Sequence, residues 1–168
     1  LLVGATAGDV DFQNLDLANA PSFFVSPFWD DLDAGGTVRW MTIGAAPNRA
    51  AVIEWRDIPR YTTAGPIGAA TFQVLLFEDG GVVFQYADVS FGIGAYDDGA
   101  SASVGIRGLS PAQSLQFSRD SASLGPNLAI RFSRGGRPDL APWLTTQPLS
   151  STGQMGGAVI SLTFDAGQ

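Results

Sequence analysis

The strongest structural signal in this chain is a pair of β-rich runs separated by a tight-turn sequence. The runs are TFQVLLF (71–77) and VVFQYADV (82–89), and EDGG (78–81) lies between them. Asp-Gly between two such runs indicates a hairpin, because glycine tolerates the positive φ that a tight turn requires. The centre of the chain is therefore predicted to be an antiparallel pair of strands.

Short runs with strand character, bounded by turn signals, recur along the rest of the chain. No window keeps the apolar spacing of i, i+3, i+4 and i+7 that is typical of a helix. In the run 50–58, Glu54 alternates with Ile53 and Trp55, which predicts a half-buried strand with Glu54 on its polar face. The whole pattern predicts an all-β chain, an antiparallel β-sandwich with essentially no helix. Further strands are expected at 21–29, 37–44, 101–108, 114–118, 127–133 and 158–164, with a loop at 59–70.

The residue composition of the sequence changes near RGGRPD (134–139). This change predicts a β-sandwich over residues 1–137 and a separate segment over 138–168. Two or three strands cannot bury a sheet face alone. The second segment therefore either packs on the first domain or opens a module whose remainder is missing. Unpaired strand edges invite pairing with another chain, so a strand-donating tail that builds a fibre is a further interpretation.

Charge and residue types restrict the function classes. The formal net charge is −7, with 16 acidic and 9 basic residues, so neither nucleic acid nor an anionic lipid surface is an expected partner. The chain has no cysteine and no histidine, which removes disulfides, thiolate ligands and the usual general base. No apolar run approaches the roughly 20 residues that span a bilayer, so no membrane insertion is predicted.

Two acidic stretches are candidate metal sites. SPFWDDLDAGG (26–36) and AYDDGAS (95–101) both combine clustered carboxylates with glycines. Calcium takes oxygen ligands of this kind, so a calcium site is one interpretation, and no other cofactor is predicted. The candidate ligands are Asp30, Asp31, Asp33, Asp97 and Asp98.

Turn chemistry is the other interpretation of these aspartates, and the sequence favours it. An Asp side chain that follows a strand accepts hydrogen bonds from nearby backbone N–H groups. The spacing of an EF-hand, with its closing glutamate, is absent. In this interpretation Phe28 and Trp29 are strand residues, and at least one of them faces the core.

No residue pair indicates a hydrolytic site, and we predict that the chain is not an enzyme. Glu54 and Glu78 are the only glutamates, and nothing pairs them across a cleft as glycoside hydrolysis requires. Exposed aromatic rings raise a different possibility, because they can stack on sugars. Tyr61 and Tyr96 lie in predicted loops and are the candidate ligand contacts, whereas Trp55 is expected in the core. The full set that raises this possibility is Trp40, Trp55, Tyr61, Tyr86 and Tyr96.

Four stretches follow one another along the chain, namely FFVSPFWDDLDAGGTVRW, AVIEWRDIPRY, TFQVLLFEDGGVVFQYADV and SASVGIRG. In this order they resemble nidogen-like (NIDO) extracellular domains and their bacterial secreted relatives. The likeness covers about residues 20–108 and extends toward 133. The absence of cysteines departs from the family pattern, although bacterial relatives often lack them. The segment PWLTTQPLSSTGQMGGAVISLTFDA is similar to the first strands of BACON-like or related Ig-like repeats of bacterial surface and secreted proteins.

The resemblance implies a non-catalytic module that is secreted or lies at the cell surface and has a structural or adhesive role. Its partners would be other protein domains or copies of itself, and residues 138–168 would begin an Ig-like module. A fold does not fix a function. The alternative therefore stays open: the chain could be a carbohydrate-binding accessory module of a secreted hydrolase, with glycans as its ligands.

Overall fold

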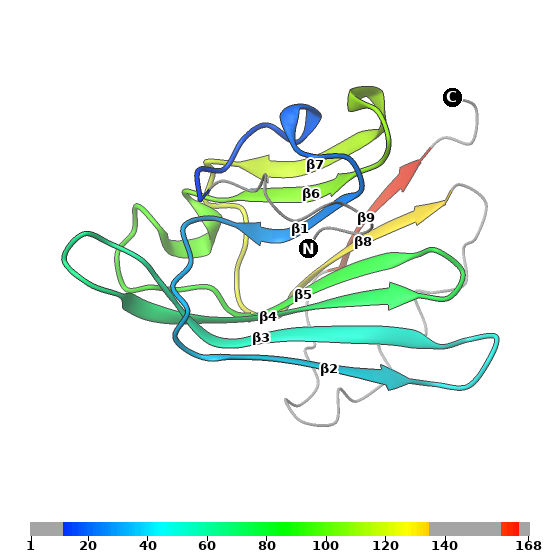
Figure 1. The fold of residues 1–168 in the computed structure, drawn as a ribbon, viewed down its shortest axis with the longest axis horizontal. Coiled ribbons are helices and arrows are strands. Elements are labelled where there is room, and N and C mark those ends of the chain that lie inside the picture. The colour runs from blue at the N-terminus through cyan, green and yellow to red at the C-terminus, as the bar shows by residue number, and fades with distance from the viewer. Residues whose placement is uncertain (1–11, 135–158, 165–168) are drawn as a thin grey trace.

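The computed structural model describes residues 12–134 and 159–164. In this part of the chain, two β-sheets pack face to face (Figure 1). The predicted all-β sandwich is confirmed, and the helical elements of the described part are single 3-10 turns. These turns are Leu17–Asn19, Asp97–Gly99 and Pro111–Gln113.

The smaller sheet joins segments that are far apart in the sequence. Its strand order is β1-β6-β7, and both pairings are antiparallel. The buried Ser26 hydroxyl donates a hydrogen bond of 2.8 Å to the Ser103 carbonyl, which ties β1 to β6. The strands are β1 (Phe24–Trp29), β6 (Ser103–Arg107) and β7 (Ser114–Arg119).

The larger sheet contains six strands in the order β2-β3-β4-β5-β8-β9. Its first four strands follow one another as antiparallel hairpins, and β8 pairs antiparallel with β5. The hairpin predicted at 71–89 is confirmed, with the Asp79 carboxylate accepting a bond of 2.9 Å from the Gly81 N–H in its turn. The strands are β2 (Thr37–Ile43), β3 (Ala50–Arg60), β4 (Ile67–Phe77), β5 (Val82–Asp88), β8 (Leu128–Arg134) and β9 (Val159–Phe164).

The strand β9 lies parallel to β8 at one edge of the large sheet. Ala129 is opposite Val159, and Arg134 is opposite Phe164. The predicted strand at 158–164 therefore joins the large sheet. The predicted boundary between 137 and 138 lies outside the described residues, and the Ig-like and strand-donating interpretations remain predictions.

The predicted loop at 59–70 is too long at both ends. The strand β3 continues through Pro59 to Arg60, and β4 already begins at Ile67. Register shifts after Trp55 and Ile58 interrupt the ladder here, and such bulges accommodate a proline that cannot donate a backbone hydrogen bond. The proline and glycine signals therefore mark bulged strand ends as well as the turn between them.

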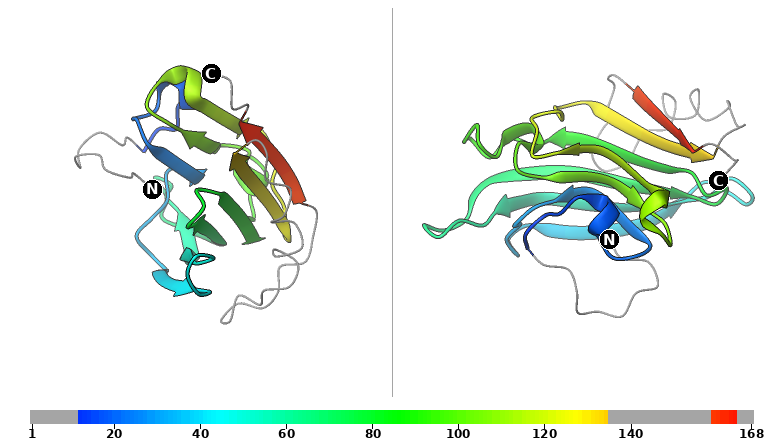
Figure 2. Two further views of the ribbon diagram at one scale, coloured as in Figure 1. Left: turned by 90° about the vertical axis from the view of Figure 1, so that its right-hand side faces the viewer. Right: turned by 90° about the horizontal axis from the view of Figure 1, so that it is seen from above.

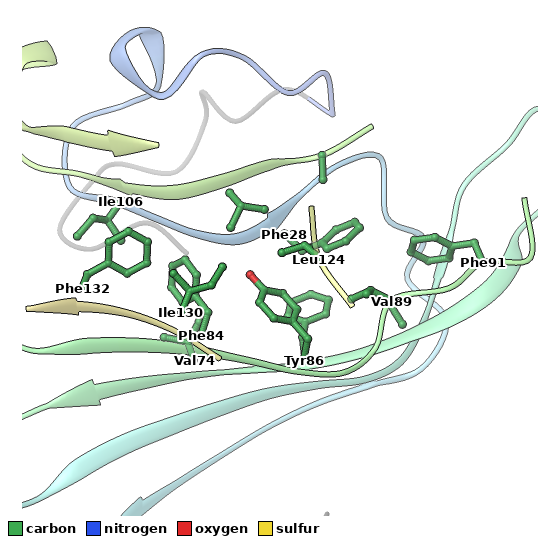
Figure 3. Close-up of a cluster of buried hydrophobic side chains, with 14 residues drawn as sticks. Phe28, Val74, Phe84, Tyr86, Val89, Phe91, Ile106, Leu124, Ile130 and Phe132 are labelled. Carbon is green, nitrogen blue, oxygen red and sulfur yellow. The ribbon is translucent and has the colours of Figure 1, made fainter. Parts of the chain in front are cut away.

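The main core lies between the two sheets (Figure 3). Phe72 and Phe84 project from the large sheet toward Phe28 on β1, which confirms that Phe28 faces the core. Tyr86 is fully buried, and its hydroxyl donates a bond of 2.7 Å to the Pro27 carbonyl, which links the two sheets. Burial raises the pKa of the Tyr86 hydroxyl well above its usual value, so the hydroxyl stays protonated and remains a donor.

Trp29 is buried in a different cluster from Phe28. Its ring meets that of Phe24 edge-on, with the ring centroids 4.8 Å apart, and Leu17 belongs to the same cluster. Consecutive strand residues point to opposite faces, so Trp29 lies on the face of the small sheet that is turned away from the main core. Both aromatic residues of the PFW stretch are thus structural.

Glu54 lies on the predicted face of β3, but the prediction that this is the polar face of a half-buried strand is wrong. Glu54 is only 4% exposed, and its Oε2 accepts a hydrogen bond of 2.5 Å from Gln73 Nε2. The register places Glu54, Gln73 and Gln85 side by side on three strands. The neighbouring row on this face contains buried Val52 and Leu75, so the polar row lies beside an apolar cluster.

An exposed ion pair joins the turn between β2 and β3 to the turn between β4 and β5. Arg49 Nη2 lies 2.7 Å from Glu78 Oε1, and hydrogen bonds from the Arg49 side chain and backbone lower the pKa of Glu78 from 4.5 to about 2. A depressed carboxyl pKa stabilises the fold above pH 4.5, and this contribution is lost as the pH falls toward 2. In urea unfolding at a series of pH values, Arg49→Gln is expected to flatten the fall in stability between these limits. Glu78→Gln should give the same flattening, and an unchanged slope in both variants would contradict the linkage.

Candidate functional site

Three of the predicted site residues, Asp30, Tyr61 and Tyr96, lie close together where β1 and β3 end. Asp30 follows β1, and its carboxylate accepts hydrogen bonds from Arg60 Nε at 3.2 Å and from Arg60 Nη2 at 3.1 Å. The Ser101 hydroxyl donates to the same carboxylate at 2.5 Å. The Asp30 side chain is 5% exposed and that of Arg60 is 13% exposed, so the ion pair is almost entirely buried.

The two candidate tyrosines lie beside this ion pair but differ in accessibility. The Arg60 guanidinium carbon stands 3.7 Å above the centre of the Tyr96 ring, so this ring is covered by a cation–π contact. Arg60 Nη1 donates a bond of 2.7 Å to the Tyr61 carbonyl, while Tyr61 as a whole is 45% exposed. Tyr61 is therefore accessible to a ligand, whereas Arg60 covers one face of the Tyr96 ring.

The glycine at position 68 helps to bring the Tyr96 loop into place. Its φ is +55°, and a Cβ there would lie 2.3 Å from the Phe91 Cα. Only glycine permits both this conformation and this close approach. The loop after β5 can therefore lie directly against the start of β4.

The remaining candidate aspartates make backbone contacts of the kind expected in turns. The Asp33 carboxylate accepts from the Gly35 N–H at 3.1 Å, and that of Asp97 accepts from the Phe91 N–H at 2.6 Å. The backbone carbonyls of Asp31 and Asp98 accept hydrogen bonds from neighbouring loops, while their side chains remain partly accessible. These bonds agree with the turn interpretation.

The described residues contain no cluster of three or more metal-ligating side chains that could hold a metal ion. Asp30 is occupied by Arg60 and Ser101, which reduces its availability to a cation. The calcium site remains a prediction.

The most exposed apolar surface lies elsewhere, on the edge strand β2. Trp40 is 80% exposed and Val38 is 58% exposed. The register aligns Trp40 with Ile53 and Val38 with Trp55, both of which are half-buried on β3. We call these four residues, Val38, Trp40, Ile53 and Trp55, the β2 shelf.

The β2 shelf continues the main core beyond the small sheet. Trp55 stacks on Phe72, with ring centroids 5.3 Å apart, so the shelf and the core share one face of the large sheet. The buried residues of the main core come from β4, β5 and β8, together with the small sheet and its connecting loops. In Figure 2, β2 lies at the end of the large sheet remote from β8. The core face therefore extends over β2 and β3, which contribute no fully buried residue to the main core.

The edge of β2 has one charged residue, Arg39, and few other features that prevent strand pairing. Proteins protect exposed edges with charged side chains, lysine above all, and with proline, bulges or very short strands. The sequence TVRWMTI contains no proline or lysine, and its seven residues pair with β3 without a register shift. Among the described strands, none pairs with the other side of β2.

Sequence reasoning placed Trp40 in a set of aromatic residues but did not select it as a site residue. The residues beside Trp40 in the sequence resemble those beside the buried strand aromatics. The reason is that Trp40 continues the same apolar face of the sheet as the buried residues. The available signal was the position of TVRWMTI at the start of a meander, where a strand has only one neighbour among consecutive hairpins.

Comparisons with known proteins give one match. The family model described as NIDO related matches residues 3–131 of the chain. No curated protein and no solved structure matches the chain. Among the described residues, no helix is long and apolar enough to cross a membrane. The family match covers more than half of the 168 residues and agrees with the all-β fold, and the chain therefore belongs to the NIDO-related family.

Proposed function

We propose that this protein is an extracellular, non-catalytic module whose β2 shelf binds another protein and so contributes to adhesion or assembly. Membership of the NIDO-related family supports the extracellular setting. The calcium-site and tail interpretations are not needed for this role. Secretion or display at the cell surface is part of the proposal.

The observation that carries the proposal is the exposure of Trp40 within a strand. An exposed apolar patch that continues a core is the surface from which protein interfaces are built, and tryptophan is enriched at the energetic centre of interfaces. Val38 adjoins Trp40 on the same face, and Met41, 42% exposed, lies on the other face of the same edge. A partner at this edge would bury apolar surface from both faces and could also use the unpaired backbone groups of β2.

Carbohydrate binding is the second candidate, and the same ring supports it. An exposed indole can stack on the apolar face of a sugar. The accessible Tyr61 belongs to the loop between β3 and β4, whereas Trp40 is on β2, so each would offer an individual contact. If carbohydrate binding is the function, the chain would be an accessory module of a hydrolase.

Binding of the purified chain to a panel of extracellular proteins and to a glycan array separates the two candidates. Under the proposal, wild-type chain is retained on protein-coated surfaces, and Trp40→Ser weakens retention about tenfold or more, as expected for a central interface residue. The matched control is Leu109→Ser, which removes a 65% exposed apolar residue from the loop between β6 and β7.

The outcome at Trp40 decides the proposed function. Retention that falls with Trp40→Ser and not with Leu109→Ser supports the β2 shelf as the binding surface. Binding to glycans alone, lost in Trp40→Ser, would replace the proposal by the carbohydrate candidate. Equal binding by wild type and Trp40→Ser on every surface would overturn both.

A further inference from the structure

We propose that the partner of the β2 shelf is the β2 strand of a second copy of this chain, paired antiparallel about a two-fold axis at Trp40. This inference rests on the proposed function and names its partner. The two large sheets would then form one continuous sheet across the interface. Each copy would present the same surface to the other, as a closed symmetric dimer requires.

The length of β2 determines the register of this pairing. The strand runs from Thr37 to Ile43, and Trp40 is its central residue. Only a register in which Trp40 faces Trp40 of the second copy keeps all seven residues in the ladder. In this register, Val38 of one copy faces Thr42 of the other.

The same register places compatible side chains opposite one another. A two-fold axis perpendicular to the sheet keeps each residue on the same face in both copies, so the two shelves form one apolar stripe. The two Trp40 rings become a cross-strand aromatic pair, which is a favourable arrangement in sheets. Arg39 is the only charged residue of β2, and it faces Met41 of the second copy, so no like charges lie directly opposite.

The size of this surface predicts a reversible dimer. Burial of one large aromatic ring removes roughly 150–250 Å² from water, whereas a stable complex buries about 800 Å² per partner. A single edge strand with its shelf lies below that size, so dissociation in the micromolar range or weaker is expected. The charge of −7 on each copy opposes association, and salt should therefore strengthen it by screening.

The absence of cysteine from the chain allows a direct test of the register. Two single variants of the full chain are made, Val38→Cys and Thr42→Cys, and both retain Trp40. Under mild oxidation, an equimolar mixture should form a disulfide-linked dimer at least tenfold faster than either variant alone. Facing strand residues have Cα atoms about 4.5–5.5 Å apart, within the range of a disulfide, whereas like positions of the two copies lie four residues apart along the strand.

The matched control is Ala51→Cys mixed with Val38→Cys. Ala51 is exposed and lies directly opposite Thr42, one strand farther from the edge. It is separated from Val38 of the second copy by about two strand spacings, roughly 10 Å, which is beyond disulfide range. This mixture should cross-link no faster than the single variants.

Sedimentation of the wild-type chain between micromolar and millimolar concentration completes the test. A monomer–dimer equilibrium that Trp40→Ser abolishes and Leu109→Ser preserves supports the inference. A wild-type monomer throughout this range, or equal cross-linking rates in all mixtures, would overturn it. Trp40-dependent retention on the protein panel in a strictly monomeric chain would leave the proposed function standing with a different partner.

Discussion

Replacement of Phe72 by alanine should lower the free energy of unfolding by about 3–5 kcal/mol, the usual cost of truncating a large core aromatic. Phe72 is 1% exposed, and its ring stacks on Phe28 at 5.6 Å and on Trp55 at 5.3 Å between centroids. The substitution therefore removes contacts with both sheets and leaves a cavity between them. Urea unfolding followed by far-ultraviolet circular dichroism measures the effect.

Trp40→Ala is the matched comparison, because Trp40 is a larger aromatic residue on the same face of the same sheet. With 80% of its surface exposed, it contributes little burial, and the stability of the monomer should change by no more than about 0.5 kcal/mol. The measurement is made at a concentration where the chain is monomeric. A loss below about 1.5 kcal/mol for Phe72→Ala, or above that value for Trp40→Ala, would contradict this division between folding and binding residues.

Asp30→Ala should also destabilise the fold, by about 3–5 kcal/mol, because it leaves the Arg60 guanidinium buried without its partner. The carboxylate accepts hydrogen bonds from Arg60, Ser101 and the Asp31 N–H, so one residue holds together three segments at the end of the sandwich. Arg60→Met removes the other charge. In the double variant the losses should be less than additive, which chemical denaturation of all four chains would reveal.

Asp31→Ala is the control for this prediction and also tests calcium. Asp31 is adjacent in sequence, and its side chain has no hydrogen bond in the described structure, so a change of about 0.5 kcal/mol or less is expected. The same unfolding experiments are run with calcium and with chelator. Comparable losses for Asp31→Ala and Asp30→Ala, present only with calcium, would assign these carboxylates to a metal site.

The strands of this fold were largely predictable because each carries its own local signal. The Asp-Gly turn at 79–80 and the alternation in β3 depend only on neighbouring residues. The bulge at Pro59 was not predictable, because a proline within a strand and a proline in a loop look alike until the register is known. The parallel placement of β9 beside β8 likewise depends on contacts between distant segments.

The candidate site was less predictable than the strands. Asp30 was recognised as an acidic residue in a turn, but its partner Arg60 lies 30 positions away, and no local pattern joins the two. Tyr96 was expected in an open loop, and the same arginine covers its ring. Trp40 was expected to behave like other strand aromatics, and its exposure follows from the smaller width of the opposing sheet.

The pairing of β1 with β6 has a consequence for synthesis of the chain from its N-terminus. The strands β2 to β5 can pair as soon as each successive hairpin emerges, and the meander is complete once Asp88 is available. At that stage β1 still lacks β6, the one described strand with which it pairs, which begins at Ser103. The nascent meander must therefore keep its apolar face from aggregating until a further stretch of chain has been translated, and non-local closure of this kind is slow.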